Sequence, residues 1–262
     1  LKLGGEEREV SVLFADIRGF TALSERQHPS DLLDLLNRYL SCMTEVIEGE
    51  GGVIDKYIGD AIMALFGAPL AHGDDAQRAV RAALAMGHEL VRLNRELTAQ
   101  GLPAIATGIG INTGLVVAGN MGSTHRLNYS VIGDGVNLAS RIEGLTRFYG
   151  VPLIISESAA AAAPEFIYRE LDRVRVKGKL EPVRIFEPLE AGILGDGELE
   201  SYHEALAHYR AREWRQADDI LAGLAAAAPA SPLYALYRQR IANFLITPPA
   251  DDWDATVVHS EK

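Results

Sequence analysis

Residues 10–16, with the sequence VSVLFAD, form an apolar run that ends abruptly on the carboxylate of Asp16. The run predicts a buried strand over residues 8–15, and the following residues IRGFT predict a glycine-bearing turn before a helix. A carboxylate at the end of a buried strand, facing the N–H groups of a helix start, is suited to hold a divalent cation beside a phosphate. The same carboxylate is equally suited to cap the helix. On this stretch alone both interpretations stay open.

The next elements bring a second carboxylate to the same place. Apolar residues at helical spacing predict a helix over 30–48, which glycines then stop, and strands over 53–57 and 61–66 flank the turn that holds Asp60. A right-handed strand–helix–strand crossover makes the first two strands parallel, so Asp16 and Asp60 are expected at one edge of the sheet. Paired carboxylates repel each other unless a cation lies between them. Their convergence therefore favours a metal site over separate capping and turn roles.

The remaining pattern predicts an α+β fold. A helix over 74–97 precedes strands over 105–112 and 115–121, joined at Thr113-Gly114, and a strand over 127–132. A helix over 135–149 carries Asn137 and Arg141 four residues apart, on one face. Further elements are expected as a strand at 151–156, a helix at 157–163, and strands at 166–177 and 183–186. The order βαββαβ followed by extra strands indicates a ferredoxin-like core with additional strands.

The composition changes beyond residue 191. Residues 192–197 read as a linker, and three helices are expected over 202–209, 214–227 and 232–245, followed by an extended polar end. This C-terminal α-helical extension resembles a single tetratricopeptide-like unit, which is too short to bury its own apolar face and so should pack on something else. We therefore predict two domains, 1–191 and 192–262.

Bulk composition narrows the class of protein. The chain has 262 residues and a net charge of −11, which argues against nucleic acid or an anionic membrane surface as its main partner. Its single cysteine, Cys42, excludes a disulfide framework and fits a reducing compartment, so a cytoplasmic location is expected. No apolar run reaches transmembrane length, and the start is no signal peptide. Leu1 is no natural initiator, so we expect an upstream regulatory or sensor region, and with it the full-length protein could be membrane-tethered.

Five motifs occur in order and together resemble a known family, the class III nucleotidyl cyclases, whose members are the adenylyl and guanylyl cyclase catalytic domains. The resemblance covers about residues 8–190, and five linked motifs are far more specific than any one of them. They are residues 14–21 (FADIRGFT), 56–61 (KYIGDA), 110–114 (GINTG), 131–141 (VIGDGVNLASR) and 176–179 (VKGK).

The resemblance implies an ATP-cyclising enzyme with two Mg²⁺ or Mn²⁺ ions per active site. It assigns the metal ligands to Asp16, the Ile17 carbonyl and Asp60. It also implies that Asn137 orients the ribose and that Arg141 stabilises charge on the α-phosphate. An ordinary surface salt bridge remains the alternative for Arg141. The further substrate-binding residues that it implies are Phe20, Thr21 and Lys177, the last of which could also be a solvated turn lysine.

Base choice is assigned by the resemblance to Lys56 and Ser130. A lysine at the first position is typical of adenine-selective members, because its ammonium can donate to adenine N1 but not to guanine N1, which carries a proton. Ser130 resembles the threonine type of the class IIIb adenylyl cyclases, although its hydroxyl can donate as well as accept and so discriminates less than an aspartate. The arginine that many relatives carry near 105–109 is absent. Its substitutes could be Arg18, Arg126 or Lys179.

In the family, the metal carboxylates come from one protomer and the base-binding and transition-state residues from the other. One chain that holds both sets therefore implies a homodimer with two equivalent sites. We predict an adenylyl cyclase, a phosphorus–oxygen lyase that converts ATP into 3′,5′-cyclic AMP and pyrophosphate. The alternatives are a guanylyl cyclase, which would need glutamate and cysteine at positions 56 and 130, and an inactive nucleotide-binding dimerisation module, which would normally lack a metal acid or the Asn/Arg pair.

Overall fold

A computed structural model describes residues 4–123 and 126–260 of the chain. They divide into two compact units. Unit 1 comprises residues up to 147 together with 151–165, and unit 2 comprises residues 148–150 together with those from 166 onward. The predicted strands at 166–177 and 183–186 therefore group with the C-terminal helices rather than with the first strands. The domain boundary expected at residue 191 stays a prediction.

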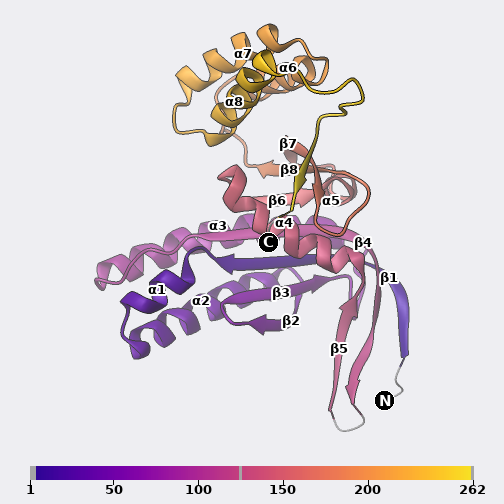
Figure 1. Cartoon of the computed structure of the whole chain (residues 1–262). Helices are drawn as coiled ribbons and strands as arrows, with labels where there is room; N and C mark the ends of the chain where they lie inside the picture. The colour runs from indigo at the N-terminus through magenta and orange to yellow at the C-terminus, as the bar shows by residue number, and fades with distance from the viewer. Residues whose placement is uncertain (1–3, 124–125, 261–262) are drawn as a thin grey trace. The chain divides into compact units, whose positions relative to one another are not determined.

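Unit 1 is built on a sheet whose strand order is β2-β3-β1-β4-β6, with β5 paired to β4 (Figure 1). Strand β1 is antiparallel to both β3 and β4, and β2 is antiparallel to β3. Strands β1 and β2 consequently run in the same direction, as the crossover argument predicts, with β3 between them. The order β2-β3-β1-β4 is that of a ferredoxin-like core, which confirms the α+β fold. The strands are β1 (Gly4–Ile17), β2 (Val53–Ile58), β3 (Ala61–Phe66), β4 (Thr107–Ser123), β5 (Arg126–Ile132) and β6 (Leu153–Ser156).

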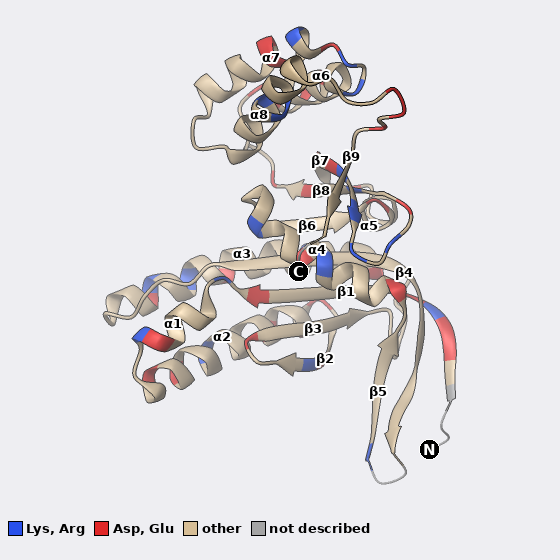
Figure 2. Cartoon of the chain, viewed as in Figure 1, with Lys and Arg blue, Asp and Glu red and all other residues tan. Residues whose placement is uncertain are grey.

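Strand β1 is longer than its apolar core suggests. The sequence predicts a strand start near residue 8, but pairing with β4 extends it back to Gly4 and forward through Ile17. The strand ends at Ile17, directly after an acidic residue, and red marks the tip of the β1 arrow (Figure 2). Tertiary pairing, rather than local hydrophobicity, sets the extent of the strand.

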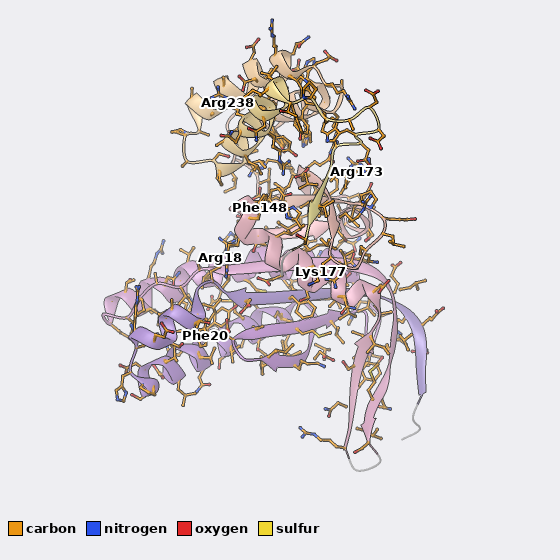
Figure 3. The ribbon with its side chains drawn as sticks, viewed as in Figure 1. Arg18, Phe20, Phe148, Arg173, Lys177 and Arg238 are labelled. Carbon is orange, nitrogen blue, oxygen red and sulfur yellow. The ribbon has the colours of Figure 1, made fainter. Side chains whose placement is uncertain are left out.

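Helix α2 (Pro29–Gly49) begins where local chemistry predicts a helix start. Helix α2 has proline at its first position, and the His28 side chain accepts a hydrogen bond from the Ser30 amide at its start. A short helix not expected from the sequence, α1, follows Gly19, whose φ of 67° is in the left-handed region that favours glycine. Phe20 is its first residue (Figure 3). The helices are α1 (Phe20–Arg26), α2 (Pro29–Gly49), α3 (Asp75–Ala99), α4 (Asp134–Tyr149) and α5 (Glu157–Ala162).

Strand β4 corrects one prediction. Thr113-Gly114 was expected to join two separate strands, but β4 runs unbroken for 17 residues. Thr113 lies opposite Ser11 and Gly114 opposite Val10 in the β1 ladder, and the Ser11 and Thr113 hydroxyls form a buried hydrogen bond of 2.7 Å. A long partner strand keeps the Thr-Gly step extended, so it makes no turn. The antiparallel ladder with β5 instead continues as far as the pair Ser123 and Arg126. Residues 124–125 lie outside the described residues.

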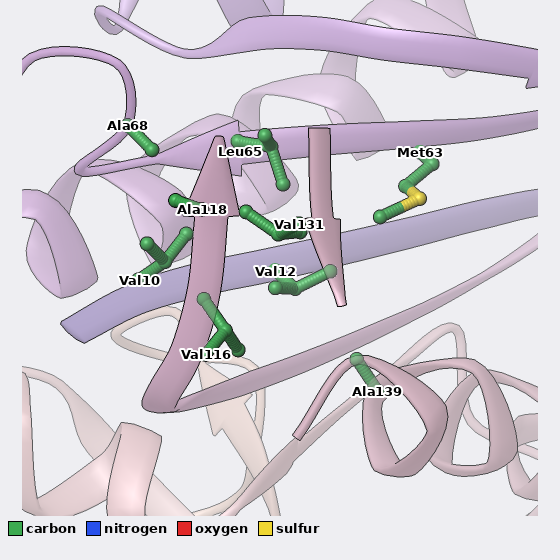
Figure 4. Packing of buried hydrophobic residues seen from close by; sticks show 9 residues of the cluster. All are labelled: Val10, Val12, Met63, Leu65, Ala68, Val116, Ala118, Val131 and Ala139. Atoms are coloured by element: carbon green, nitrogen blue, oxygen red, sulfur yellow. The ribbon is translucent and has the colours of Figure 1, made fainter. Parts of the chain in front are cut away.

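A buried apolar cluster joins β1, β3, β4, β5 and α4 within unit 1 (Figure 4). Side chains two apart on a strand share a face, and directly paired residues of neighbouring strands share it too. The cluster therefore fixes which face of β1 looks toward α4, and it holds the strands that lead to Asp16. Its members are Val10, Val12, Met63, Leu65, Ala68, Val116, Ala118, Val131 and Ala139.

In the described residues from 166 to 260, unit 2 contains three strands and three helices. Strand β7 (Ile167–Val176) is antiparallel to β8 (Val183–Leu189) and parallel to β9 (Thr256–His259). The extended end expected from the sequence thus includes a strand that pairs with β7. The helices are α6 (Glu198–Arg210), α7 (Trp214–Ala227) and α8 (Pro232–Ile246), close to the predicted bounds. None of the helices within residues 4–123 and 126–260 is long and apolar enough to cross a membrane.

Buried acids of β7 tie the helices of unit 2 to its sheet. The Asp172 carboxylate accepts a hydrogen bond of 2.6 Å from the Tyr149 hydroxyl and lies 2.8 Å from the Arg240 guanidinium of α8. The latter is an ion pair by distance, without an aligned hydrogen bond. Glu170 accepts two hydrogen bonds of 2.8 Å from Arg184 and another from Arg210 of α6. Burial alone raises the pKa of Glu170, but these arginines outweigh it and lower the pKa to about 2.

Candidate active site

Asp16 and Asp60 come together as the crossover predicts. Asp16 is the last-but-one residue of β1, and Asp60 sits in the turn between β2 and β3. Asp60 Oδ2 accepts a hydrogen bond of 3.1 Å from the Ile17 amide. Burial, a hydrogen bond with Asp60 and the Asp60 charge together raise the pKa of Asp16 to about 8. The two carboxyl groups are thus close enough to share a proton.

The pair fits a divalent cation. Asp16 Oδ1 is buried and has no hydrogen-bond partner among the described residues. A buried acceptor left without a donor is unfavourable, and a hard cation is the natural partner for two facing carboxylates. No group of three or more His, Cys, Asp and Glu side chains in the described parts of the chain is arranged to hold a metal. A bound ion would therefore rely on Asp16, Asp60, backbone carbonyls and oxygens from its substrate.

A third carboxylate, Glu143, was not predicted. Gly108 lies directly opposite Asp16 in the β1–β4 ladder, and a Cβ atom placed on Gly108 would lie 2.9 Å from Glu143 Oε1. The missing side chain lets α4 bring Glu143 over the strand beside Asp16. Burial raises the pKa of Glu143 to about 7, and Arg147 and Arg18 oppose that rise. The Gly108-x-Gly110 spacing was the sequence signal for this close approach.

Arg18 and Tyr39 line the same end of unit 1. The Arg18 guanidinium donates to the Val151 carbonyl, while its Nε is buried without a partner among the described residues (Figure 3). Burial lowers the pKa of Arg18, and the Glu143 charge acts against that effect. Tyr39 of α2 is fully buried, and burial together with the Asp16 and Asp60 charges raises the pKa of its phenol. Arg18 is thus a cation near the acids. Its role as a substitute for the absent strand arginine stays a prediction.

Helix α4 presents Asn137 and Arg141 on one face. No hydrogen bond or ion pair holds either side chain within the described residues, so the surface salt bridge considered for Arg141 is not formed. The start of the helix is fixed by Asn112 of β4, whose side-chain amide donates a bond of 3.0 Å to the Gly135 carbonyl. Ser156 in turn donates to Asn112 Oδ1 at 2.7 Å. The GINTG motif therefore anchors the helix that carries the two candidate residues.

The two base-selecting candidates converge on a residue that the sequence reasoning missed. Ser130 Oγ of β5 donates a hydrogen bond of 3.0 Å to Asp55 Oδ2 of β2. Lys56 Nζ lies 3.3 Å from the same oxygen. The only sequence signal for Asp55 was its position beside Lys56. The structure thus brings Lys56 and Ser130 together, although 74 positions separate them in the sequence.

The remaining predicted substrate residues belong to different segments of the chain. Phe20 and Thr21 open α1, directly after the turn that follows Asp16. Lys177 follows β7 in unit 2, is exposed, and precedes Gly178, whose φ is 79°. Among the alternatives for the absent arginine, Arg126 is exposed at the start of β5 and Lys179 lies in the turn after β7. Their roles stay predictions.

Comparisons with known proteins agree with this geometry. Residues 5–189 match the family described as the adenylate and guanylate cyclase catalytic domain. An adenylate cyclase from Anabaena cylindrica is 47% identical over 190 residues, which cover 69% of this chain and 36% of that protein. The chain thus spans about a third of the length of this curated relative.

Solved structures show the same likeness. The adenylyl cyclase CyaB from P. aeruginosa is 36% identical, with a TM-score of 0.68 over 74% of this chain and 100% of that one. A guanylyl cyclase of known crystal structure is 39% identical, with a TM-score of 0.68 over 74% of this chain and 99% of that one. Matches of this extent, on a fold that places the predicted motifs as described, show that the chain belongs to the adenylate and guanylate cyclase catalytic domain family.

Proposed function

We propose that the chain is the catalytic region of an adenylyl cyclase, which converts ATP into 3′,5′-cyclic AMP and pyrophosphate. The convergence of Asp16 and Asp60, with a buried carboxylate oxygen left without a donor, is the observation that carries this proposal. In the reaction the ribose 3′-oxygen bonds to the α-phosphorus, the bond from that phosphorus to the pyrophosphate oxygen breaks, and the hydroxyl proton leaves to solvent. Only a site that neutralises the triphosphate can support this step.

Asp16 and Asp60 would hold two Mg²⁺ or Mn²⁺ ions, with the Ile17 carbonyl as a further ligand. Such ions supply positive charge that lowers the pKa of the ribose 3′-hydroxyl and offsets the charge of the triphosphate. Side chains of the protein would position the substrate and stabilise the remaining charge. Asn137 would orient the ribose, Arg141 would stabilise the negative charge that develops on the α-phosphate, and Lys177 would contact the terminal phosphates. The backbone at Phe20 and Thr21 would bind phosphate.

A homodimer forms part of this proposal. Unit 1 exposes several large apolar side chains along β2, β4 and β5, the strands that also carry Lys56 and Ser130. Clustered exposed apolar residues are typical of an interaction surface, and a two-fold contact would place the base-selecting residues of one copy beside the acids of the other. These exposed residues are Val53, Tyr57, Ile58, Leu115, Val117 and Ile132.

The test is product identification by chromatography after incubating the purified protein with Mn²⁺ and either ATP or GTP, across a protein dilution series. Cyclic AMP is expected from ATP, with a specific activity that falls on dilution as the dimer dissociates. Cyclic GMP formed in preference from GTP would instead identify a guanylyl cyclase. No cyclic product from either nucleotide would indicate a nucleotide-binding module. Full activity of Asp60→Asn with metal present would contradict the two-metal assignment.

A further inference from the structure

Asp55 is a buried carboxylate placed between the two residues assigned to base choice. Its Oδ2 atom is the common acceptor for Ser130 Oγ at 3.0 Å and Lys56 Nζ at 3.3 Å. Its Oδ1 atom is buried and has no partner within the described residues. Because the carboxylate has few donors around it, it is a strong acceptor for the Ser130 hydroxyl and the Lys56 ammonium. Nothing in the metal site accounts for this arrangement.

An irregularity in the β2–β3 ladder places Asp55 there. Ile54 lies opposite Ala64 and Lys56 opposite Met63, so Asp55 is an extra residue with no partner in β3. A bulge of this kind redirects a side chain that regular alternation would point to the other face. Met63 belongs with Val131 to one apolar cluster, so the Lys56 position shares the face on which β5 packs. The bulge thus leaves Asp55 in contact with Ser130 of β5 and with its own neighbour Lys56.

Exposure increases from the carboxylate outward. The Asp55 side chain is 0% exposed, Ser130 is 7% exposed, and the Lys56 side chain is 51% exposed. A ligand that approaches from solvent would meet the ammonium and the hydroxyl, with the carboxylate shielded behind them. Asp55 is therefore suited to act through its neighbours rather than to touch a base itself.

The donor and acceptor roles at Ser130 follow from this geometry. A carboxylate can only accept, so the hydroxyl must donate its one proton to Asp55. The Ser130 oxygen then has only lone pairs to offer a ligand. A serine with a free hydroxyl could turn its proton toward an acceptor, but this one is held as an acceptor.

We propose that Asp55 is a positioning residue that holds Ser130 as an acceptor and thereby sets a preference for adenine over guanine. The Lys56 ammonium, a donor, matches adenine N1, and the Ser130 oxygen, an acceptor, matches the adenine 6-amino group. Guanine presents the opposite pattern, with a proton on N1 and an acceptor at O6. Asp55 thus removes the ambiguity that a serine would otherwise bring to this position. This inference rests on the proposed cyclase function.

The experiment compares the ratio of kcat/KM for ATP to kcat/KM for GTP in the full chain and in variants. In Asp55→Ala the freed hydroxyl can donate to guanine O6, and the ratio should fall about tenfold, as expected when one discriminating hydrogen bond is lost. Asp55→Asn, whose amide oxygen can still accept from Ser130, should keep a ratio nearer to that of the original chain. Ser130→Ala should lower the ratio as Asp55→Ala does. A merely structural role for Asp55 would lower both rates together.

A double variant separates the two neighbours of Asp55. On a Ser130→Ala background, Asp55→Ala should change the ATP/GTP ratio less than twofold, because the hydroxyl that it controls is gone. A tenfold change on that background would show that Asp55 acts through Lys56 and would overturn the proposal. The matched control is Asp75→Asn, a carboxylate that accepts backbone N–H bonds from His72 and Gly73 at the start of α3. The ATP/GTP ratio of Asp75→Asn should equal that of the original chain.

Equilibrium binding of 3′-deoxy-ATP and 3′-deoxy-GTP, which lack the reacting hydroxyl, gives a readout that does not need turnover. Their affinity ratio should shift in the same direction and by a similar factor in Asp55→Ala. An unchanged affinity ratio in both Asp55→Ala and Ser130→Ala would overturn the inference, and Ser130→Ala alone suffices if Asp55→Ala does not fold. Failure of the original chain to form any cyclic nucleotide would instead contradict the proposed function.

Discussion

The pKa values of buried carboxylates are shifted in opposite directions in the two units. In unit 2, Glu170 is surrounded by the guanidinium groups of Arg184 and Arg210, which lower its pKa to about 2 despite burial. In unit 1, Asp16 faces Asp60, and burial together with that neighbour raises the pKa of Asp16 to about 8. The same chemical group is thus stabilised as an anion in one unit and disfavoured as an anion in the other.

This contrast separates structural acids from functional ones. An acid matched by the protein's own arginines needs nothing further, and it serves to hold helices to a strand. Acids that face each other with no basic side chain between them reduce stability unless something from outside supplies positive charge. Perturbed carboxylates of the second kind are typical of functional sites.

The largest effect on activity is expected from replacing Asp16 by a neutral residue. Asp16→Asn removes one anionic ligand from the proposed metal site while keeping the size of the side chain. Cyclic AMP formation at saturating Mn²⁺ should fall roughly a thousandfold or more. The measurement is the initial rate of product formation by chromatography.

A matched control for this variant is Asp34→Asn, which changes an exposed acid of α2 that lies 3.9 Å from Arg38. Its rate should stay within twofold of the original, because exposed ion pairs contribute little. A rate for Asp16→Asn within tenfold of the original would contradict the assignment of Asp16 as a metal ligand.

Removing the cation that pairs with a buried structural acid should lower the stability of the protein. Arg240→Met leaves Asp172 buried without its cation and should lower the free energy of unfolding of unit 2 by about 3 kcal/mol. Both tryptophans of the chain, Trp214 and Trp253, lie in unit 2, so tryptophan fluorescence during urea unfolding reports on that unit. The control on the same helix is Arg238→Met, whose partner Asp218 is at the surface, with an expected change below about 1 kcal/mol. Equal effects of the two variants would argue against a structural role for the Arg240–Asp172 pair.

Metal binding should depend on pH in a defined direction. A carboxyl pair that retains a proton up to pH 8 must release it when a cation binds, so affinity for Mn²⁺ should rise with pH. The apparent dissociation constant should fall by up to about tenfold per pH unit between pH 6 and 8, and level off above that. Calorimetric titration with Mn²⁺ at several pH values measures it. A constant affinity from pH 6 to 8 would show that no shared proton is displaced.

The smallest effect concerns stability without metal. The folded-state pKa of Asp16 is raised above its unfolded value of about 3.8, so its contribution to stability is complete below that value and is lost as pH rises through about 8. At pH 9 without metal, Asp16→Asn should therefore be more stable than the original chain. Solvent screening of this half-buried group limits the gain to roughly 1 kcal/mol, or about 2–4 °C in Tm. Thermal unfolding in a chelator, at pH 5 and pH 9, tests the sign.

Much of unit 1 could be predicted because its signals are local or topological. The helix over 30–48 has strong periodicity and glycines at its end, and it is found as Pro29–Gly49. The convergence of Asp16 and Asp60 needed only the handedness of one crossover. These are the parts of the fold that short stretches of sequence, together with general packing rules, determine.

Other features depend on partners that are distant in the sequence. The Thr113-Gly114 step has the composition of a turn, and only its pairing with β1 keeps it extended. Glu143 reaches Asp16 because Gly108 lies opposite Asp16 on β4. Asp55 meets Ser130 because of a ladder irregularity that no local pattern reports. Each of these required the register between strands, which a single sequence does not supply.

Gly110 lies directly beneath α4, where an added methyl group would lie 2.7 Å from the Ala139 carbonyl oxygen and closer still to the Glu143 amide. The helix and the strand therefore interlock, backbone against backbone, and the helix cannot slide along β4 without a clash. Asn137 and Arg141 consequently move with the sheet as one rigid body. In the proposed homodimer, moving these two side chains into or out of a catalytic position would then require tilting one whole chain against its neighbour, because α4 packs too closely on β4 to shift along it.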